Sequence, residues 1–168
     1  EFAWDRLLIR DYHQRTIYYF YTAKRRGSLS SPAFLALFRN TLAPMLIPFS
    51  SLLLHGAAVA FDEKIALFLA PDGGGKTTLV SKFDPGSILN DDQVLLARQN
   101  DGLQIFGTPF GTLYHRYLVG EPRGIFLLEK SPATRLTPLT IKDVVKFIWE
   151  QHSHIWMTLP PSLRARAF

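Results

Sequence analysis

Cysteine is absent from this sequence of 168 residues. Disulfide bonds, a cysteine nucleophile and cysteine-ligated zinc are therefore excluded. The absence also fits a reducing compartment, and we expect a cytoplasmic protein.

Long uninterrupted apolar helices and basic stripes are absent as well. The stretch at 42–61 has no acidic or basic residue except His55 and is long enough to cross a bilayer, but Pro44 and Pro48 interrupt it. We expect the end of a helix and then a buried strand there, and no membrane partner. The formal net charge is +5, yet the basic residues form no stripe beyond the run at 24–26, so we expect no nucleic-acid partner.

What is present indicates one α/β domain over 1–168. Apolar residues make up 47% of the chain and charged residues 20%, which suits a buried core and argues against disorder. Hydrophobic periodicity and turn signals predict strands at 16–23, 52–61, 65–70, 87–90, 93–98, 103–107 and 123–130, and helices from Pro32 to Pro48, at 76–83 and at 140–151. Hairpins beside a strand-loop-helix unit favour a mixed β-sheet. We divide the domain into an N-terminal strand and helix over 1–50 and a core over 52–150.

A glycine cluster follows the apolar strand at 65–70. Residues 70–77 read Ala-Pro-Asp-Gly-Gly-Gly-Lys-Thr and match the phosphate-binding pattern G-x-x-x-x-G-K-[ST] except at Ala70. Glycines let a backbone fold tightly around an anion, with N–H groups and a helix start facing the phosphates. We predict that Lys76 neutralises the β- and γ-phosphates of a nucleotide and that Thr77 offers a hydroxyl to Mg²⁺. The predicted nucleotide-binding residues are Asp72, Gly73, Gly74, Gly75, Lys76, Thr77 and Thr78.

Two polar clusters flank this loop in the sequence. Leu54-His55-Gly56 lies on a predicted strand before the loop, and Asn90-Asp91-Asp92 lies at a predicted strand end after it. An acidic residue at such a strand end can meet Mg²⁺ or a substrate hydroxyl. Taken singly, a histidine on a strand is more often a core residue, and an aspartate pair is more often a turn.

Together, the order of LHG, a hairpin, the glycine loop and DD resembles the catalytic domain of HPr kinase/phosphorylase and its small HPr-serine-kinase-like relatives. Their core is shared with phosphoenolpyruvate carboxykinase. The resemblance covers about 52–150 and extends to the GTPF run at 107–110 and the RGIFLLE run at 123–129. It implies a phosphoenolpyruvate-carboxykinase-like α/β fold, in which a P-loop and flanking helices accompany a mixed sheet, and a nucleotide-binding catalytic core.

The resemblance also implies roles for single residues. His55 matches an active-site histidine, Lys76 the phosphate-loop lysine, Asp91 the catalytic base and Asp92 an acidic neighbour near the metal. Ala70 departs from the family glycine. The connection from the helix to the aspartate pair is also shorter than in the HPr enzymes, which leaves a shift of one position open. No counterpart of the phosphorolysis segment is found.

The expected activity is therefore transfer of the γ-phosphoryl group from ATP, with Mg²⁺, to a hydroxyl of a protein or peptide, most simply a serine. Arg116, Arg123 and Arg135 are candidates for contacting phosphate or an acidic substrate. A carboxykinase would need a much longer chain, and a GTPase would need a guanine-reading N-K-x-D motif, which is absent. A plain NTPase and a catalytically decayed nucleotide-binding or scaffold module remain alternatives. HPr kinases assemble as hexamers, so a homo-oligomer stays open.

Overall fold

The computed structural model describes residues 6–11, 14, 16–21, 32–100, 102–157 and 161. The chain divides into two compact units, Glu1–Phe49 with Ile155–Phe168, and Ser50–His154. The predicted strand residues 22–23 and the tail over 162–168 lie outside the described residues. Within the described ranges, no helix combines the length and the apolar character needed to cross a membrane.

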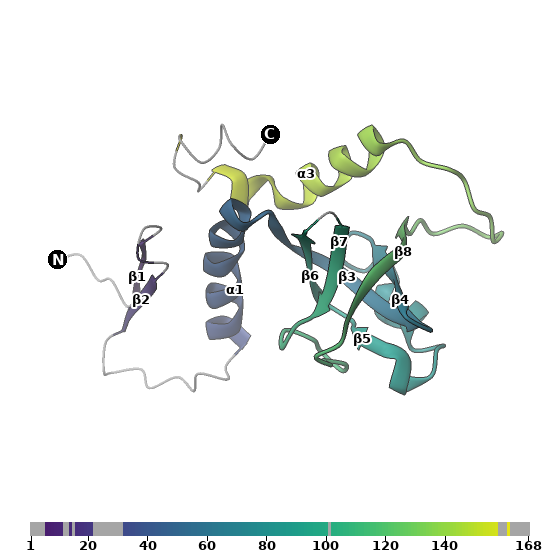
Figure 1. The fold of residues 1–168 in the computed structure, drawn as a ribbon, viewed down its shortest axis with the longest axis horizontal. Helices are drawn as coiled ribbons and strands as arrows, with labels where there is room; N and C mark the ends of the chain where they lie inside the picture. Colours follow the sequence, from purple (N-terminus) through teal and green to yellow (C-terminus); the bar gives the residue numbers. More distant parts are fainter. Residues whose placement is uncertain are drawn as a thin grey trace. The chain divides into compact units, whose positions relative to one another are not determined.

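The first unit contains a β-hairpin and a helix (Figure 1). Strand β1 (Arg6–Asp11) pairs antiparallel with β2 (Thr16–Tyr21). Helix α1 (Pro32–Leu46) is followed by the short 3₁₀ helix η1 (Ile47–Phe49). The predicted helix between Pro32 and Pro48 is confirmed. It begins at Pro32 because proline is well tolerated in a first helical turn. Strand β1 was not predicted.

The second unit is built on a six-stranded mixed sheet with the order β4-β8-β7-β6-β3-β5, in which β4 also pairs with β3 (Figure 1). The strands are β3 (Ser51–Phe61), β4 (Lys64–Leu69), β5 (Ile88–Asn90), β6 (Gln93–Gln99), β7 (Gly102–Gly107) and β8 (Val119–Leu127). Only the β4–β8 pair is parallel among these pairings. The long strand β3 pairs with β6 over its first half and with β4 and β5 over its second half. The predicted α/β class with a mixed sheet is confirmed.

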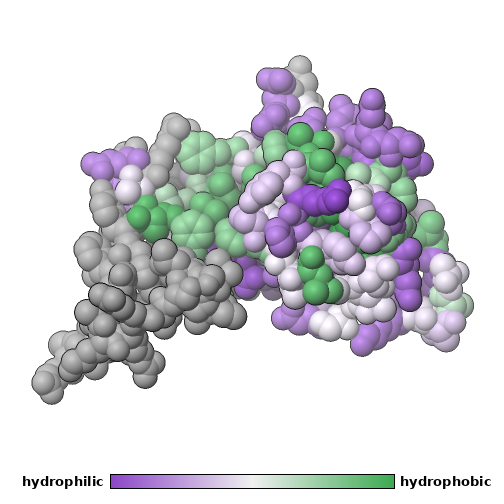
Figure 2. Space-filling view, turned by 90° about the horizontal axis from the view of Figure 1, so that it is seen from below, coloured by the Kyte–Doolittle hydropathy of each residue, from purple (hydrophilic) through white to green (hydrophobic). Residues whose placement is uncertain are grey.

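Both faces of this sheet carry packed apolar residues. Alternate residues of a strand point to opposite sides, so one strand contributes to both faces. On β4, Ile65, Leu67 and Leu69 belong to one buried cluster, and Phe147 and Ile148 of helix α3 (Ile141–Met157) pack against it. Ala66 and Phe68 point to the other face, where helix α2 (Lys76–Val80) contributes the buried Val80. Apolar residues also stay exposed between hydrophilic ones on the surface (Figure 2).

Several element boundaries differ from the predictions. Helix α2 ends at Val80 rather than at residue 83, because the N–H groups of Lys82 and Phe83 donate to carbonyl oxygens only three residues back and form turns instead of α-helix. Asp84 is extended (φ −57°, ψ 126°), as expected before Pro85. Residues Pro85–Ser87 then form the 3₁₀ helix η2. Strand β8 begins at Val119 rather than at residue 123. It includes Pro122, which has no N–H to donate, and its register with β4 shifts next to Ile65, the partner of this proline.

The predicted start of α3 is confirmed, although the helix continues beyond its predicted end to Met157. The Thr140 hydroxyl donates to Oδ2 of Asp143 over 2.7 Å. The Thr140 N–H donates to the same Oδ2 over 3.0 Å, and the Asp143 N–H donates back to the Thr140 hydroxyl over 3.3 Å. These reciprocal bonds form a capping box, which satisfies N–H groups that have no partner inside the helix. The hydrogen bonds from Thr140 lower the pKa of Asp143.

Candidate functional site: a glycine loop beside a histidine and two aspartates

The sheet places the glycine loop and the aspartate pair at the same edge. Strands β4 and β5 both run antiparallel to β3, so they run parallel to each other. Ala70 directly follows β4, and Asp91 directly follows β5. The carboxyl ends of parallel strands meet at one edge of a sheet, which is where ligands bind in many open α/β sheets.

Each glycine of the loop is required for one of two physical reasons. Gly73 (φ +68°) and Gly75 (φ +92°) adopt left-handed backbone conformations that other residues rarely adopt. Gly74 has no room for a side chain, because a Cβ atom there would lie 2.6 Å from the Cβ of Ala70 and 2.9 Å from the Pro71 carbonyl oxygen. The loop therefore folds back tightly on its own first two residues.

Lys76 is enclosed by this loop. The residue is only 6% exposed, and its Nζ donates to the carbonyl oxygens of Ala70 (2.8 Å) and Pro71 (3.2 Å). Burial lowers the pKa of Lys76, whereas the charges of Asp72 and Asp92 act in the opposite direction. The arrangement holds an ammonium group among glycine-loop backbone atoms, with two carboxylates close enough to affect it.

His55 connects the loop with the aspartate pair. Its Nε2 atom lies 3.2 Å from Oδ1 of Asp92 and 3.5 Å from Oδ1 of Asp72. The side chains of His55 and Asp92 are 22% and 26% exposed, whereas that of Asp72 is 98% exposed. The structure thus brings together four of the predicted site residues from three segments of the chain: His55, Asp72, Lys76 and Asp92.

Asp91 makes a different set of contacts. Its carboxylate is buried, and Oδ1 accepts hydrogen bonds from the backbone N–H groups of Thr112 (2.8 Å), Leu113 (3.2 Å) and Tyr114 (3.2 Å). Oδ2 accepts a further bond from Leu113 N–H at 3.2 Å. These bonds anchor the segment at 112–114, as a carboxylate that stabilises the fold would do.

Sequence reasoning missed the residues that fix the two aspartates. Asn90 is fully buried, and its Oδ1 accepts from the backbone N–H groups of Asp92 and Gln93, both over 2.8 Å. Its Nδ2 donates to the Thr108 carbonyl oxygen over 2.8 Å, while the Thr108 hydroxyl donates to the Gln93 carbonyl oxygen over 2.6 Å. An asparagine that bonds N–H groups two and three residues on is a local turn signal and could have been recognised. Thr108 carries no such signal, because its partners are distant in the sequence.

The remaining candidate residues are two threonines of α2 and three arginines. Thr77 and Thr78 are exposed in the first turn of α2. Arg116 donates Nη1 to the Gly86 carbonyl oxygen over 2.7 Å, Arg123 lies over the ring of Phe61, and Arg135 is exposed.

Metal binding by Thr77 and Asp92 stays a prediction. Among the described residues, no group of three or more His, Asp or Glu side chains is arranged to hold a metal ion. Mg²⁺ usually keeps several waters and takes few protein ligands, so such a group is not required for nucleotide-bound Mg²⁺.

Comparison of the chain with family models, with curated proteins and with solved structures gives no match.

Proposed function

We propose that the glycine loop at 70–77 binds the phosphates of ATP, and that the chain transfers the γ-phosphoryl group to a hydroxyl of a protein or peptide, most simply a serine. The observation that supports this best is the buried Lys76, whose ammonium group lies within the glycine loop while His55 and Asp92 lie beside it. This makes the protein an HPr-kinase-like phosphotransferase in our proposal. Its proposed setting is the cytoplasm, where ATP is available.

The donor set fits a nucleotide with Mg²⁺. Glycine N–H groups and a lysine ammonium suit phosphate oxygens, and a threonine hydroxyl with a nearby carboxylate suits a hard cation. Lys76 would exchange its bonds to Ala70 and Pro71 for bonds to phosphate oxygens. The hydroxyl of Thr77 would hold Mg²⁺, which spreads the charge that develops on the transferred group. The resemblance also implies Asp92 as a neighbour of the metal, but the contacts of this residue favour another role.

The contacts of the two aspartates favour a shift of one position in the proposed roles. Asp92 lies against His55, close enough to the loop for its charge to act on Lys76, whereas Asp91 is bonded to the segment at 112–114. We therefore assign to Asp92 the orientation of the substrate hydroxyl and the acceptance of its proton. His55 holds Asp92 in position. In the reaction the hydroxyl oxygen bonds to the γ-phosphorus, the bond from that phosphorus to the β-phosphate oxygen breaks, and ADP leaves.

A second candidate function is a nucleotide-binding module that transfers nothing. It is favoured by the four hydrogen bonds that occupy Asp91, the residue that the resemblance implies as the base. Under this reading, the loop would bind ATP in order to stabilise the fold or to control a partner.

Incubation with ATP labelled at the γ-phosphate, Mg²⁺ and a panel of serine-containing proteins and peptides distinguishes the candidates. The kinase proposal expects label on a serine, lost in the Lys76→Ala variant. Label released only as free phosphate would indicate a plain NTPase. Binding of ATP without turnover would indicate the nucleotide-binding module. No binding of ATP would contradict the proposal that the glycine loop binds its phosphates.

A further inference from the structure

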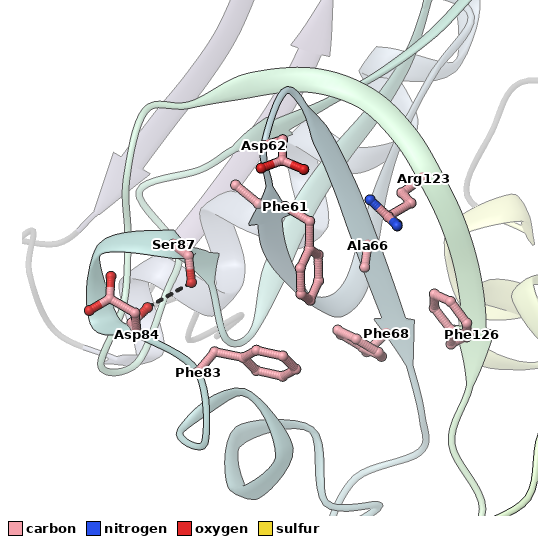
Figure 3. Close-up of a pocket in the computed structure, with 10 residues that line it drawn as sticks. Phe61, Asp62, Ala66, Phe68, Phe83, Asp84, Ser87, Arg123 and Phe126 are labelled. Carbon is pink, nitrogen blue, oxygen red and sulfur yellow. Dashed lines mark hydrogen bonds between the residues drawn. The ribbon is translucent and has the colours of Figure 1, made fainter.

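A second candidate binding site lies on the sheet face that α2 only partly covers. An open pocket of about 660 Å³ is present there, beside the β3–β4 turn, where Phe61 ends β3 and Asp62 follows it (Figure 3). It is lined by residues of β3, β4, β8 and the segment after α2: Ala60, Phe61, Asp62, Ala66, Phe68, Phe83, Asp84, Ser87, Arg123 and Phe126. The volume is in the range of sites that hold small organic ligands.

Small residues make the hollow. Ala66 of β4 and Gly124 of β8 are directly paired in the sheet, so two neighbouring positions bring almost no side-chain volume. A Cβ atom on Gly124 would lie 3.1 Å from the ring of Phe126, a tight contact that a side chain there could make only if this ring shifted slightly. The pocket therefore exists because small residues occupy these two positions.

Phenyl rings form its walls. Phe68 stacks against Phe126 at 5.4 Å between ring centroids and against Phe83 at 6.3 Å, and Phe61 meets Phe83 edge-on at 5.4 Å. Figure 3 shows the four rings arranged around one space. Rings with this spacing pack against one another and form one continuous aromatic wall, whose surface towards the pocket can contact a flat apolar group.

The two ends of the pocket differ in charge. The guanidinium group of Arg123 lies 5.9 Å from the centroid of the Phe61 ring, and within the described part of the chain it makes no ion pair. Asp84 and Ser87 lie on the opposite side, with Asp62 between the two ends (Figure 3). A guanidinium held over an aromatic ring presents several donors to an anion. Because Arg123 already covers the Phe61 ring, a cationic ligand would be repelled there.

We propose that this pocket binds a small planar aromatic anion. The aromatic part lies against the surface that the phenyl rings form, the anionic group accepts hydrogen bonds from Arg123, and an N–H or O–H at the other end of the ligand is directed towards Asp84. The lining of this pocket includes no residue of the glycine loop at 70–77, and its residues nearest to α2 in the sequence, Phe83, Asp84 and Ser87, follow the last residue of that helix. The proposal is therefore independent of nucleotide binding by the glycine loop.

A matched pair of fluorescent probes tests the proposal. 1-Anilinonaphthalene-8-sulfonate carries an anionic group and an N–H, and N-phenyl-1-naphthylamine has the same ring system without the sulfonate. Both are titrated against wild type, Arg123→Gln, Ala66→Leu and, as a surface control, Arg98→Gln. We expect Arg123→Gln to weaken binding of the sulfonate about tenfold and to leave binding of the neutral probe unchanged, because only the charge-assisted contact is lost. Ala66→Leu fills the hollow and is expected to weaken both.

Nuclear magnetic resonance of the wild type provides a measurement that requires no core substitution. Addition of the sulfonate probe should shift the backbone amide signals at 60–68, 83–87 and 123–126, and Mg²⁺ with ATP should not reverse these shifts. Equal weakening of both probes by Arg123→Gln, no effect of this variant, or shifts confined to other parts of the chain would overturn the proposal.

Discussion

The Nε2 atom of His55 lies 3.2 Å from Oδ1 of Asp92, and this contact joins β3 to the turn that follows β5. The pair is fixed from both sides. The backbone N–H of Gly56 donates to the Asp92 carbonyl oxygen over 2.9 Å, and the Asp92 N–H donates to the side chain of Asn90. A residue whose backbone is held on both sides, and whose carboxylate contacts His55 beside a glycine loop, is well placed to orient a nucleophile, which is a large part of catalysis of phosphoryl transfer.

We predict that Asp92→Asn slows phosphoryl transfer about a hundredfold and leaves ATP affinity nearly unchanged, because the amide keeps the size but accepts a proton poorly. Single-turnover rates with labelled ATP measure the effect. If Asp92 acts instead mainly through Mg²⁺, excess Mg²⁺ should restore the rate. A wild-type rate in Asp92→Asn, together with an inactive but stable Asp91→Asn, would return the base role to Asp91.

Asp91→Asn is expected to act on stability. One carboxylate oxygen accepts three backbone N–H groups, and an amide nitrogen in either position loses acceptor capacity. The free energy of unfolding should fall by about 2 kcal/mol. Urea denaturation measures this loss, with the exposed Glu129→Gln as a control that should change little. Unchanged stability in Asp91→Asn would mean that the segment at 112–114 does not depend on this carboxylate.

The packing of the glycine loop is tested by a double-mutant cycle. Gly74→Ala should lower the free energy of unfolding by about 1–3 kcal/mol, since its Cβ would overlap that of Ala70. Ala70→Gly alone should lower it by up to about 1 kcal/mol through backbone entropy. The double variant should lose less than the sum of the two, because the overlap between the Cβ atoms disappears, although the Pro71 oxygen still limits the recovery. Strict additivity would show that the two residues do not meet.

The lowered pKa of Lys76 predicts that both the stability of the fold and the affinity for ATP depend on pH. Burial lowers the folded-state pKa below the ordinary value of 10.5. The unfolded chain therefore keeps its proton to higher pH, so the free energy of unfolding should rise with pH between the lowered pKa and 10.5. ATP affinity should fall over the same interval as the ammonium loses its charge. Lys76→Met should bind more weakly at neutral pH and lack this fall, and an equal pH dependence in both proteins would contradict the role of Lys76.

The sequence alone predicted most elements whose signals are local. Continuous apolar runs located β3 and β4, and Pro32, Pro48 and the Thr140–Asp143 pair marked helix ends correctly. The different contacts of Asp91 and Asp92 could not be predicted in this way. Neighbouring residues on an extended chain point to opposite sides, so their environments depend on contacts with His55 and with the segment at 112–114, which are far away in the sequence.

The central claim is that the glycine loop binds nucleotide phosphates through Lys76, and isothermal titration calorimetry with ATP and Mg²⁺ tests it most directly. The wild type should bind one nucleotide per chain, and Lys76→Ala should bind at least about tenfold more weakly, in line with the loss of a charge-assisted contact. Circular dichroism of the variant should match that of the wild type, so that a loss of affinity reports on the loop rather than on unfolding. Equal affinities of the two proteins, or no heat of binding with the wild type, would contradict the account.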